Sequence, residues 1–135
     1  MSPSFDETRF GEELPADVPD VGLEAVKRFT RTTGMRAGRF VDAEAARKEG
    51  LPGPIVPGIM SQGILAAVIH RWAPDAEVLR LDTTFRAPLL VGSRPTCRAV
   101  VTDRDEAART VEVDLTLANE AGETRVVGTA RVRLP

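Results

Sequence analysis

The chain has 135 residues, enough for one domain with a real core and too few for two. Its hydrophobic fraction of 42% and charged fraction of 28% are ordinary for a globular protein in water. The net charge is −2, and no basic block points to a nucleic acid as partner. A single cysteine, Cys97, excludes an internal disulfide and favours the cytoplasm. One histidine, one cysteine and unclustered carboxylates argue against a metal site.

The first third of the chain predicts an arm and two short helices. Residues 1–20 are polar and acidic, and Phe5 and Phe10 are expected to attach this arm to the core. Residues 22–33 carry apolar side chains three positions apart, which predicts a helix with one apolar face. A second short helix is predicted over residues 43–49, before a glycine that ends it.

The most informative segment follows. A loop rich in proline and glycine leads into about 15 almost wholly apolar residues, Gly58–Trp72, and Pro74 forbids their continuation as a helix. A helix that is apolar on nearly every side must be enclosed by other structure. It is shorter than the roughly 20 residues that a membrane span requires.

The start of this helix is also a candidate site. Its first backbone N–H groups lack intrahelical partners and lie at the positive end of the helix dipole. Such an end, met by a glycine-rich loop, can stabilise a developing negative charge such as a thioester oxyanion. From this segment alone, a core helix with a stiff entry loop remains the alternative.

After Pro74 the hydrophobic period changes to two, which predicts four strands with one buried face each. The predicted inward positions are Leu79, Leu81, Thr83 and Phe85; Cys97, Ala99 and Val101; Val111, Val113, Leu115 and Leu117; and Val126, Gly128, Ala130, Val132 and Leu134. Helices followed by an antiparallel meander indicate an α+β fold, with the apolar helix laid across the sheet.

Three segments form recognisable motifs. Residues 50–60 read Gly-Leu-Pro-Gly-Pro-Ile-Val-Pro-Gly-Ile-Met, residues 85–92 read Phe-Arg-Ala-Pro-Leu-Leu-Val-Gly, and residues 29–34 read Phe-Thr-Arg-Thr-Thr-Gly. They resemble, in that order, the loop-to-helix segment, the following strand-turn element and the segment before the catalytic loop of the MaoC-like hydratase/dehydratase family. The resemblance covers most of the chain. It implies that residues 1–135 form a single hotdog domain, with a long central helix wrapped by an antiparallel sheet of five or more strands.

The resemblance further implies enzymes that add water to enoyl-thioesters, or remove it, through an Asp/His pair in a loop of the form Gly-Asp-x-Asn-Pro-Ile-His-x-Asp. Residues 34–42 of this chain read Gly-Met-Arg-Ala-Gly-Arg-Phe-Val-Asp. Met35 stands at the family's Asp and Phe40 at its His, and neither side chain can transfer a proton. Losing general acid or base help costs about 10²–10⁴ in rate for each role, so we expect this loop to be catalytically degenerate.

No remaining residue is assigned as the catalyst. Asp42 is a helix N-cap or a weak acid/base candidate, and Ser61 either satisfies a backbone group or faces a bound thioester. His70 lies near the far end of the central helix, where a capping or interface role is favoured over catalysis. Cys97 is favoured as a small core residue over a nucleophile.

Binding residues are predicted around the altered loop. Arg31, Arg36 and Arg39 bracket it, as a solvated surface or as a cluster for coenzyme A phosphates or acidic groups of a partner. Met35, Phe40, Ile55 and Met60 are expected to form an apolar wall that touches or covers an acyl chain. The predicted substrate-binding residues are Arg36, Arg39, Ile55, Gly58, Met60 and Ser61.

The leading hypothesis is therefore the non-catalytic subunit of a heteromeric enoyl-CoA hydratase acting on a bulky acyl group. It would pair with a second hotdog subunit, as a homodimer or as a heteromer with a catalytic MaoC-like protein, because a sheet edge needs covering. No cofactor is expected beyond coenzyme A or an acyl carrier as thioester carrier, and no membrane or nucleic-acid partner. One alternative is a thioesterase or hydratase that uses non-standard residues, and another is a binding module without a thioester ligand.

Overall fold

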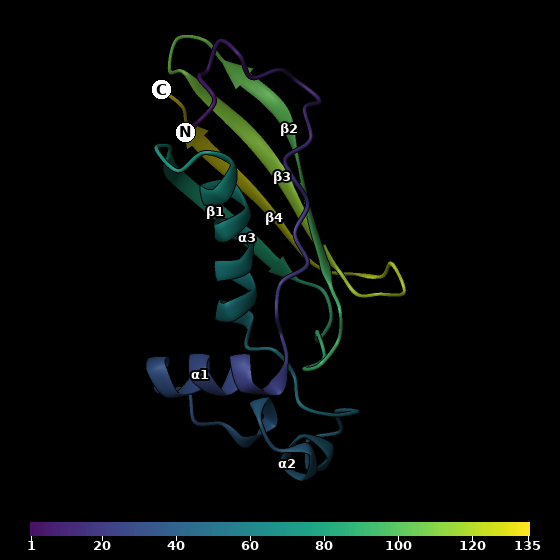
Figure 1. Ribbon diagram of the computed structural model, residues 1–135. Helices are drawn as coiled ribbons and strands as arrows, with labels where there is room; N and C mark the ends of the chain where they lie inside the picture. Colours follow the sequence, from purple (N-terminus) through teal and green to yellow (C-terminus); the bar gives the residue numbers. More distant parts are fainter.

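The computed structural model describes residues 1–135, with the helical segments first and the strands after them (Figure 1). In chain order the elements are α1 (Leu23–Thr33), the 3₁₀ turn η1 (Gly38–Phe40), α2 (Ala43–Lys48), α3 (Gly58–Trp72), β1 (Glu77–Phe85), β2 (Thr96–Asp105), β3 (Thr110–Ala118) and β4 (Thr124–Arg133). The predicted α+β class, the three α-helices and the four strands are confirmed. No helix is both long and apolar enough to cross a membrane.

The sheet is antiparallel throughout, in the order β1-β4-β3-β2. The inward faces of β2, β3 and β4 are buried at the predicted positions. The expectation of a buried face for β1 was wrong at Phe85, which is 53% exposed although its ring lies against Gly58, and at Leu79. A shift in register between Val78 and Arg80 makes Leu79 the extra residue of a bulge, so Val78 takes the inward place opposite Val132, and Leu79 is 42% exposed.

The sheet has four strands, rather than the five or more that were expected. The N-terminal arm forms only isolated bridges, which pair Glu13 with Val100 and Asp17 with Cys97 along β2. The arm therefore covers the outer edge of β2 without forming a regular strand. On the other side of the sheet, β1 has no neighbour beyond it.

The two phenylalanines of the arm behave differently. Phe5 is buried, its N–H donates to the carbonyl of Pro135 at 2.8 Å, and the guanidinium of Arg104 lies 4.2 Å from its ring centroid. Phe10 is 74% exposed, so the expectation that it attaches the arm to the core was wrong. The arm is held by Phe5 and by the backbone bridges to β2.

Helix α3 lies against one face of the sheet (Figure 1), and its inward side chains Ile64, Leu65, Val68 and Ile69 are all buried. A Cβ added at Gly128 of β4 would come within 2.7 Å of Leu65 Cδ1. The absence of a side chain at Gly128 therefore allows the helix to approach the sheet closely.

A smaller layer of α1, η1 and α2 lies beyond the N-terminus of α3, away from the sheet (Figure 1). Gly34 ends α1 in the left-handed conformation, at φ 73°, with its N–H bonded to the carbonyl of Thr30. Asp42 begins α2, where its carboxylate accepts the N–H groups of Glu44 and Ala45. This layer carries the residues of the altered loop to the entrance of α3.

Candidate functional site

A cavity of about 330 Å³ opens at the N-terminus of α3, between the entry loop and the end of β1. Its lining residues are Ile55, Val56, Gly58, Ser61, Phe85, Arg86, Ala87, Pro88, Leu89 and Val126. The entry loop is fixed by backbone bonds across the cavity, from Val56 N–H to the Leu89 carbonyl at 2.8 Å and from Val91 N–H to the Pro54 carbonyl at 2.9 Å. Most of the lining is apolar, so the cavity, which we call the helix-entry cavity, suits an acyl or thioester group.

The polar groups of this cavity are hydrogen-bond donors. The N–H groups of Gly58, Ile59 and Met60 have no acceptor in the protein, as expected for the first turn of a helix. The Ser61 side chain is only 2% exposed, and its hydroxyl forms no hydrogen bond within the chain. Arg86 adds a positive charge that has no ion pair. These groups can bind an anionic or carbonyl oxygen, but none of them can accept a proton from water at neutral pH.

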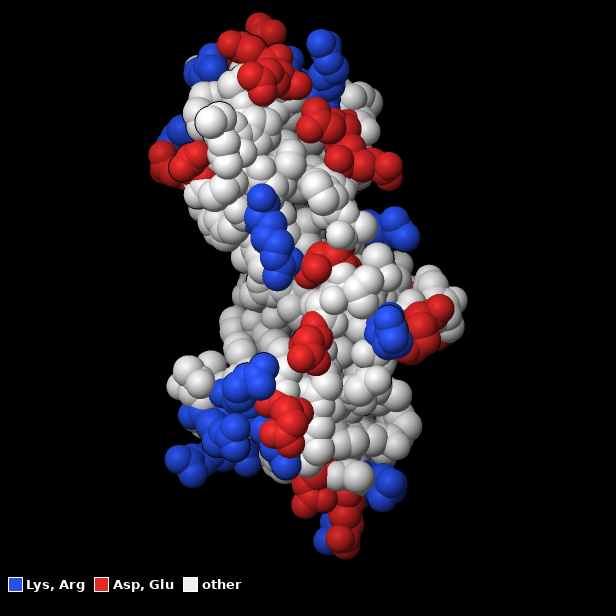
Figure 2. Space-filling view, viewed as in Figure 1, with Lys and Arg blue, Asp and Glu red and all other residues white.

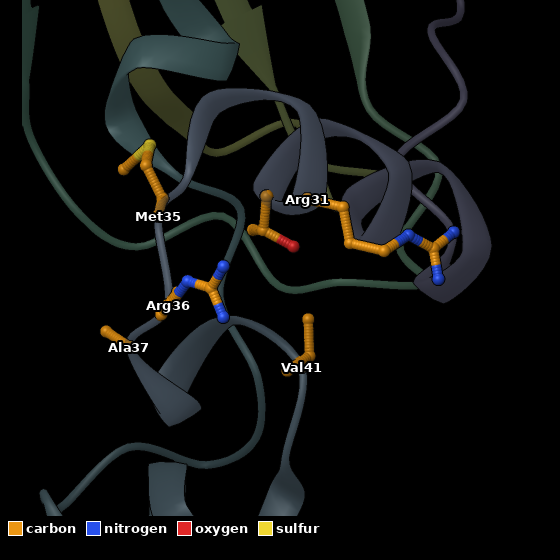
Figure 3. A pocket seen from close by; sticks show the side chains of 6 residues that line it. Arg31, Met35, Arg36, Ala37 and Val41 are labelled. Carbon is orange, nitrogen blue, oxygen red and sulfur yellow. The ribbon is translucent and has the colours of Figure 1, made fainter.

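A larger cavity, of about 480 Å³, lies between α1 and the segment that follows it. Its six lining residues are Thr30, Arg31, Met35, Arg36, Ala37 and Val41. In Figure 3 the guanidinium of Arg36 reaches across the opening between α1 and Val41, while the side chain of Arg31 runs along α1. We call this the arginine cavity. It shares no lining residue with the helix-entry cavity.

The structure separates the four residues that were expected to form one apolar wall. Met35 lines the arginine cavity and Ile55 lines the helix-entry cavity. Phe40 is 8% exposed, belongs to the hydrophobic core and lines neither cavity. Met60 is half-buried against the core and also lines neither. The sequence resemblance assigns the family's catalytic His to the position of Phe40. In this chain, the side chain at that position therefore packs in the hydrophobic core.

The remaining candidates also have clear places. Arg39 is held by Glu49 at 3.1 Å and lies over the Phe40 ring, 5.7 Å from its centroid, so it lines neither cavity. Asp42 is occupied as the N-cap of α2. His70 is exposed in the last turn of α3, at the end opposite the helix-entry cavity. Cys97 is fully buried, and this burial, with the nearby charge of Asp17, raises the pKa of its thiol to about 12.

Among the predicted binding residues, Gly58, Ser61 and Ile55 meet at the helix-entry cavity, whereas Arg36 lies at the other. Residue-by-residue reasoning missed Phe85 and Arg86 as lining residues. The Phe85 ring lies against Gly58, where an added Cβ would be 3.2 Å from it. The similarity of residues 85–92 to a family element was the one sequence signal that could have pointed to them.

Comparisons with known proteins identify proteins that are similar to this chain in sequence pattern and in fold. A family model described as a MaoC like domain matches residues 26–122. The structure of the (R)-hydratase from A. caviae involved in PHA biosynthesis is 20% identical, with a TM-score of 0.89 over 95% of this chain and 98% of that one. The ChsH1-ChsH2 complex from Mycobacterium tuberculosis is 17% identical, with a TM-score of 0.87 over 95% and 99%.

A MaoC-like dehydratase is 25% identical, with a TM-score of 0.93; the match covers 99% of this chain but only 43% of that one. A search of curated proteins found no match. The structural similarities confirm that a helix wrapped by this antiparallel sheet is a hotdog fold. Because the family model spans most of the sequence, the chain belongs to the MaoC-like hydratase/dehydratase family.

Proposed function

We propose that this chain is the non-catalytic subunit of a heteromeric enoyl-CoA hydratase or dehydratase. The observation that carries the proposal is the lining of the two cavities, because neither contains a carboxylate or an imidazole. Hydration of an enoyl-thioester needs a base to activate water and an acid to protonate the α-carbon. By the sequence resemblance, Met35 and Phe40 stand where the family places those groups; Met35 lines the arginine cavity and Phe40 is buried.

The chain keeps the features that bind a thioester. The free N–H groups at the start of α3 and the unbonded Ser61 hydroxyl offer donors to a thioester carbonyl oxygen. The apolar walls of the helix-entry cavity fit an acyl chain. The chain would thus hold or cover a bulky acyl group while the partner supplies the acid and the base.

A second hotdog subunit is the partner that the open surfaces favour. Helix α3 is apolar on nearly every side, yet Ile59 is 53% exposed and Gly63 and His70 face away from the sheet. Beside it, the free edge of β1 exposes Leu79 and Phe85. Pairing along this edge would enclose both the helix and the strand. The structural similarity to the ChsH1-ChsH2 complex supports a heteromer of two such chains.

A cytoplasmic setting completes the proposal. The only cysteine, Cys97, is a free and buried thiol, which is compatible with a reducing compartment. Coenzyme A or an acyl carrier would deliver the acyl group, and no metal or redox cofactor is part of the proposed reaction.

The test is hydration of crotonyl-CoA and of bulkier enoyl-CoA substrates, by the purified chain and by its mixture with a catalytic MaoC-like subunit. We expect negligible turnover by the chain alone and turnover by the mixture. Robust hydration by the isolated chain would contradict the proposal. If the activity of the isolated chain disappeared in Asp42→Ala or Ser61→Ala, the chain would be an enzyme that uses non-standard residues. If the activity survived both substitutions, the catalytic group would lie elsewhere in the chain.

A further inference from the structure

We propose that the N-terminal arm guards the edge of β2 against pairing with the β2 edge of a second copy of this chain, and that a clasp around Phe5 locks the arm in place. The covered edge of β2 is thus a second interaction surface, distinct from the open edge of β1. The inference concerns assembly and does not depend on the proposed function.

The arm occupies the outward backbone groups of β2, beside which it runs (Figure 1). The carbonyl oxygens of Cys97, Ala99 and Val101 each accept an N–H group of the arm, at distances of 2.8 to 3.0 Å. The N–H groups of Cys97 and Val101 donate to carbonyl oxygens of the arm, both at 2.8 Å. A strand with open backbone groups at its edge is a template for another strand, so the arm removes that template.

The outer side of the arm is itself unsuited to strand addition. Residues 12–20 include four acidic residues, two prolines and no basic residue. Figure 2, viewed as Figure 1, shows acidic side chains along the side of the molecule that the arm occupies. Charges of one sign repel a second copy of the same segment, and proline lacks the N–H group that a strand ladder needs. The sheet therefore ends at the arm.

The strand beneath the arm has the composition of a segment that pairs readily. Thr96–Thr102 reads Thr-Cys-Arg-Ala-Val-Val-Thr, with one charged residue and neither proline nor glycine. Segments of six or seven residues with high β-propensity, low net charge and no proline are those that pair with copies of themselves. Without the arm, β2 would present such a segment at an open edge.

A second copy of β2 fits this edge in one register. The outward backbone groups belong to alternate residues, Cys97, Ala99 and Val101. An antiparallel pair centred on Ala99 places Ala99 opposite its own copy and Cys97 opposite Val101, so that each outward group meets a partner. This pair stays between Pro95, which has no N–H group, and the register shift that follows Val101.

The side chains agree with this register. On the solvent face of the sheet, Arg98 of one copy lies opposite Val100 of the other, so no like charges meet. On the inner face, the apolar side chains of Cys97 and Val101 come together. A two-fold axis relates the two copies, so each of these contacts occurs twice.

A clasp around Phe5 holds the start of the arm. Phe5 is 2% exposed, and its N–H group donates to the carbonyl of Pro135 at 2.8 Å. Its own carbonyl accepts from Arg104 Nη2 at 3.1 Å, and the guanidinium groups of Arg104 and Arg109 lie 4.2 and 5.4 Å from its ring centroid. Figure 1 shows the two ends of the chain side by side at this place. The clasp thus joins the arm to the end of β4 and to the hairpin between β2 and β3.

Arg109 has a backbone conformation that glycine would adopt more easily. Its φ is 54°, and it is the only residue other than glycine with a positive φ. Its guanidinium donates to the Pro135 carbonyl at 3.3 Å and lies 3.8 Å from the carboxylate of Asp6. Residues held in this region persist where the surrounding contacts fix them. The contacts that fix Arg109 are those of the clasp, so the turn and the clasp support each other.

The arm competes with a second copy for the same backbone groups. Because the arm belongs to the same chain, its effective concentration at β2 is on the order of millimolar. A second copy at micromolar concentration is therefore excluded while the clasp holds. Loss of the clasp lets the arm leave the edge more often, which shifts the competition toward the second copy.

Two substitutions open the clasp, and a third is the control. Phe5→Ala removes the buried ring, and Arg109→Gly removes a guanidinium while suiting the positive φ of its turn. Phe10→Ala changes an arm residue that is 74% exposed. In the purified full chain we expect hydrogen exchange at the amides of Cys97 and Val101, followed by NMR, to become at least about tenfold faster in both clasp variants. Phe10→Ala should change it by less than about twofold, and the amides that join β3 to β4 should stay protected in all three variants.

Sedimentation velocity on the same proteins measures assembly. Relative to the species that the unmodified chain forms at micromolar concentration, the clasp variants should form one of at least about twice the mass, because a second edge has become available. Phe10→Ala should sediment as the unmodified chain does.

Val100 tests the register in the Phe5→Ala background. Val100→Lys places a second positive charge opposite Arg98 at both symmetry-related positions, and it should weaken the added association at least about threefold. Val100→Glu places a negative charge there and should strengthen it. Opposite effects of the two substitutions identify pairing of β2 with β2.

The inference fails if exchange at Cys97 and Val101 becomes faster without added association, or if Phe10→Ala associates as strongly as the clasp variants. It also fails if the added association is insensitive to the sign of the charge at Val100, since the contact would then lie on another surface. If Phe5→Ala loses protection across the whole sheet, Arg109→Gly decides the outcome. Unchanged exchange in Arg109→Gly would then show that the clasp does not lock the arm.

Discussion

Phe40, which stands at the loop position that the sequence resemblance assigns to a catalytic His, has a structural role in this chain. Its ring is 8% exposed and packs within the hydrophobic core. Truncation to alanine would leave a cavity, so we expect Phe40→Ala to lose about 3 kcal/mol or more of unfolding free energy. Urea denaturation followed by circular dichroism measures this loss.

Met35→Ala is the matched control. Met35 is only half-buried and borders the open arginine cavity, so its truncation should cost clearly less than that of Phe40. An unchanged denaturation midpoint in Phe40→Ala would mean that Phe40 is not a core residue and would return it to the predicted apolar wall.

Gly128 controls the distance between α3 and the sheet. An added methyl group would meet Leu65 Cδ1 at 2.7 Å and the carbonyl oxygen of Asp82 at 3.3 Å. We expect Gly128→Ala to destabilise the fold by about 1–3 kcal/mol through overpacking. Leu65→Val in the same chain should recover part of this loss. If the loss of unfolding free energy in the double variant equalled the sum of the losses in the two single variants, this contact would not limit the packing.

Cys97 gives a pH dependence of known sign. Burial raises the pKa of its thiol from 9.0 to about 12, so above pH 9 the folded state holds a proton that the unfolded state releases. The stability from this group is therefore complete below pH 9 and lost as the pH rises from 9 toward 12. Between pH 9 and 11, the free energy of unfolding of Cys97→Ala should fall less steeply than that of the unmodified protein. The two slopes should differ by up to about 1.4 kcal/mol per pH unit. Parallel curves for the two proteins would contradict the assignment.

Among the elements, α3 was the most predictable and β1 the least. The bounds Gly58–Trp72 follow from local chemistry, because a proline-rich loop precedes the apolar run and Pro74 forbids its continuation. The bulge at Leu79 depends on pairing with β4, and a pattern of alternating residues within one strand does not contain that information.

The candidate site was predictable in part for the same reason. The loop-to-helix junction placed Gly58 and Ser61 together, because both lie on one continuous segment. Phe85 and Arg86 join them only through the return of β1 to the start of α3, a contact between distant parts of the chain. The division of the expected apolar wall between two cavities and the core likewise depends on tertiary packing.

The free edge of β1 carries a prediction about association. Leu79 projects at this edge from the bulge and is 42% exposed. If a second subunit covers it, Leu79→Lys buries a charge at the interface, and we expect the affinity between subunits to fall at least tenfold, with little change in folding of the single chain. Sedimentation velocity over a range of concentrations measures the affinity.

Val18→Lys is the control for this experiment. Val18 is also an exposed apolar residue, 57% accessible, but it lies in the arm on the side of β2. Its substitution should leave association unchanged. Equal effects of the two substitutions would indicate general surface hydrophobicity, and no effect of either would remove β1 from the interface.

At the scale of the whole molecule, one edge of the sheet is covered and the other is open. The N-terminal arm covers β2 through bridges at Glu13 and Asp17, whereas nothing covers β1 or the outward side of α3, where Ile59 is exposed. An uncovered edge beside an apolar helix favours pairing in water, since pairing satisfies the strand's backbone groups and removes apolar area from solvent. We therefore expect light scattering at micromolar concentration to give a mass of at least two chains, alone or with a catalytic hotdog subunit. A preference for the mixed species would separate the heteromer from the homodimer. A stable monomer under both conditions would show that the exposed edge and helix face do not form an interface, and the proposal of a partner-dependent enzyme would lose its structural basis.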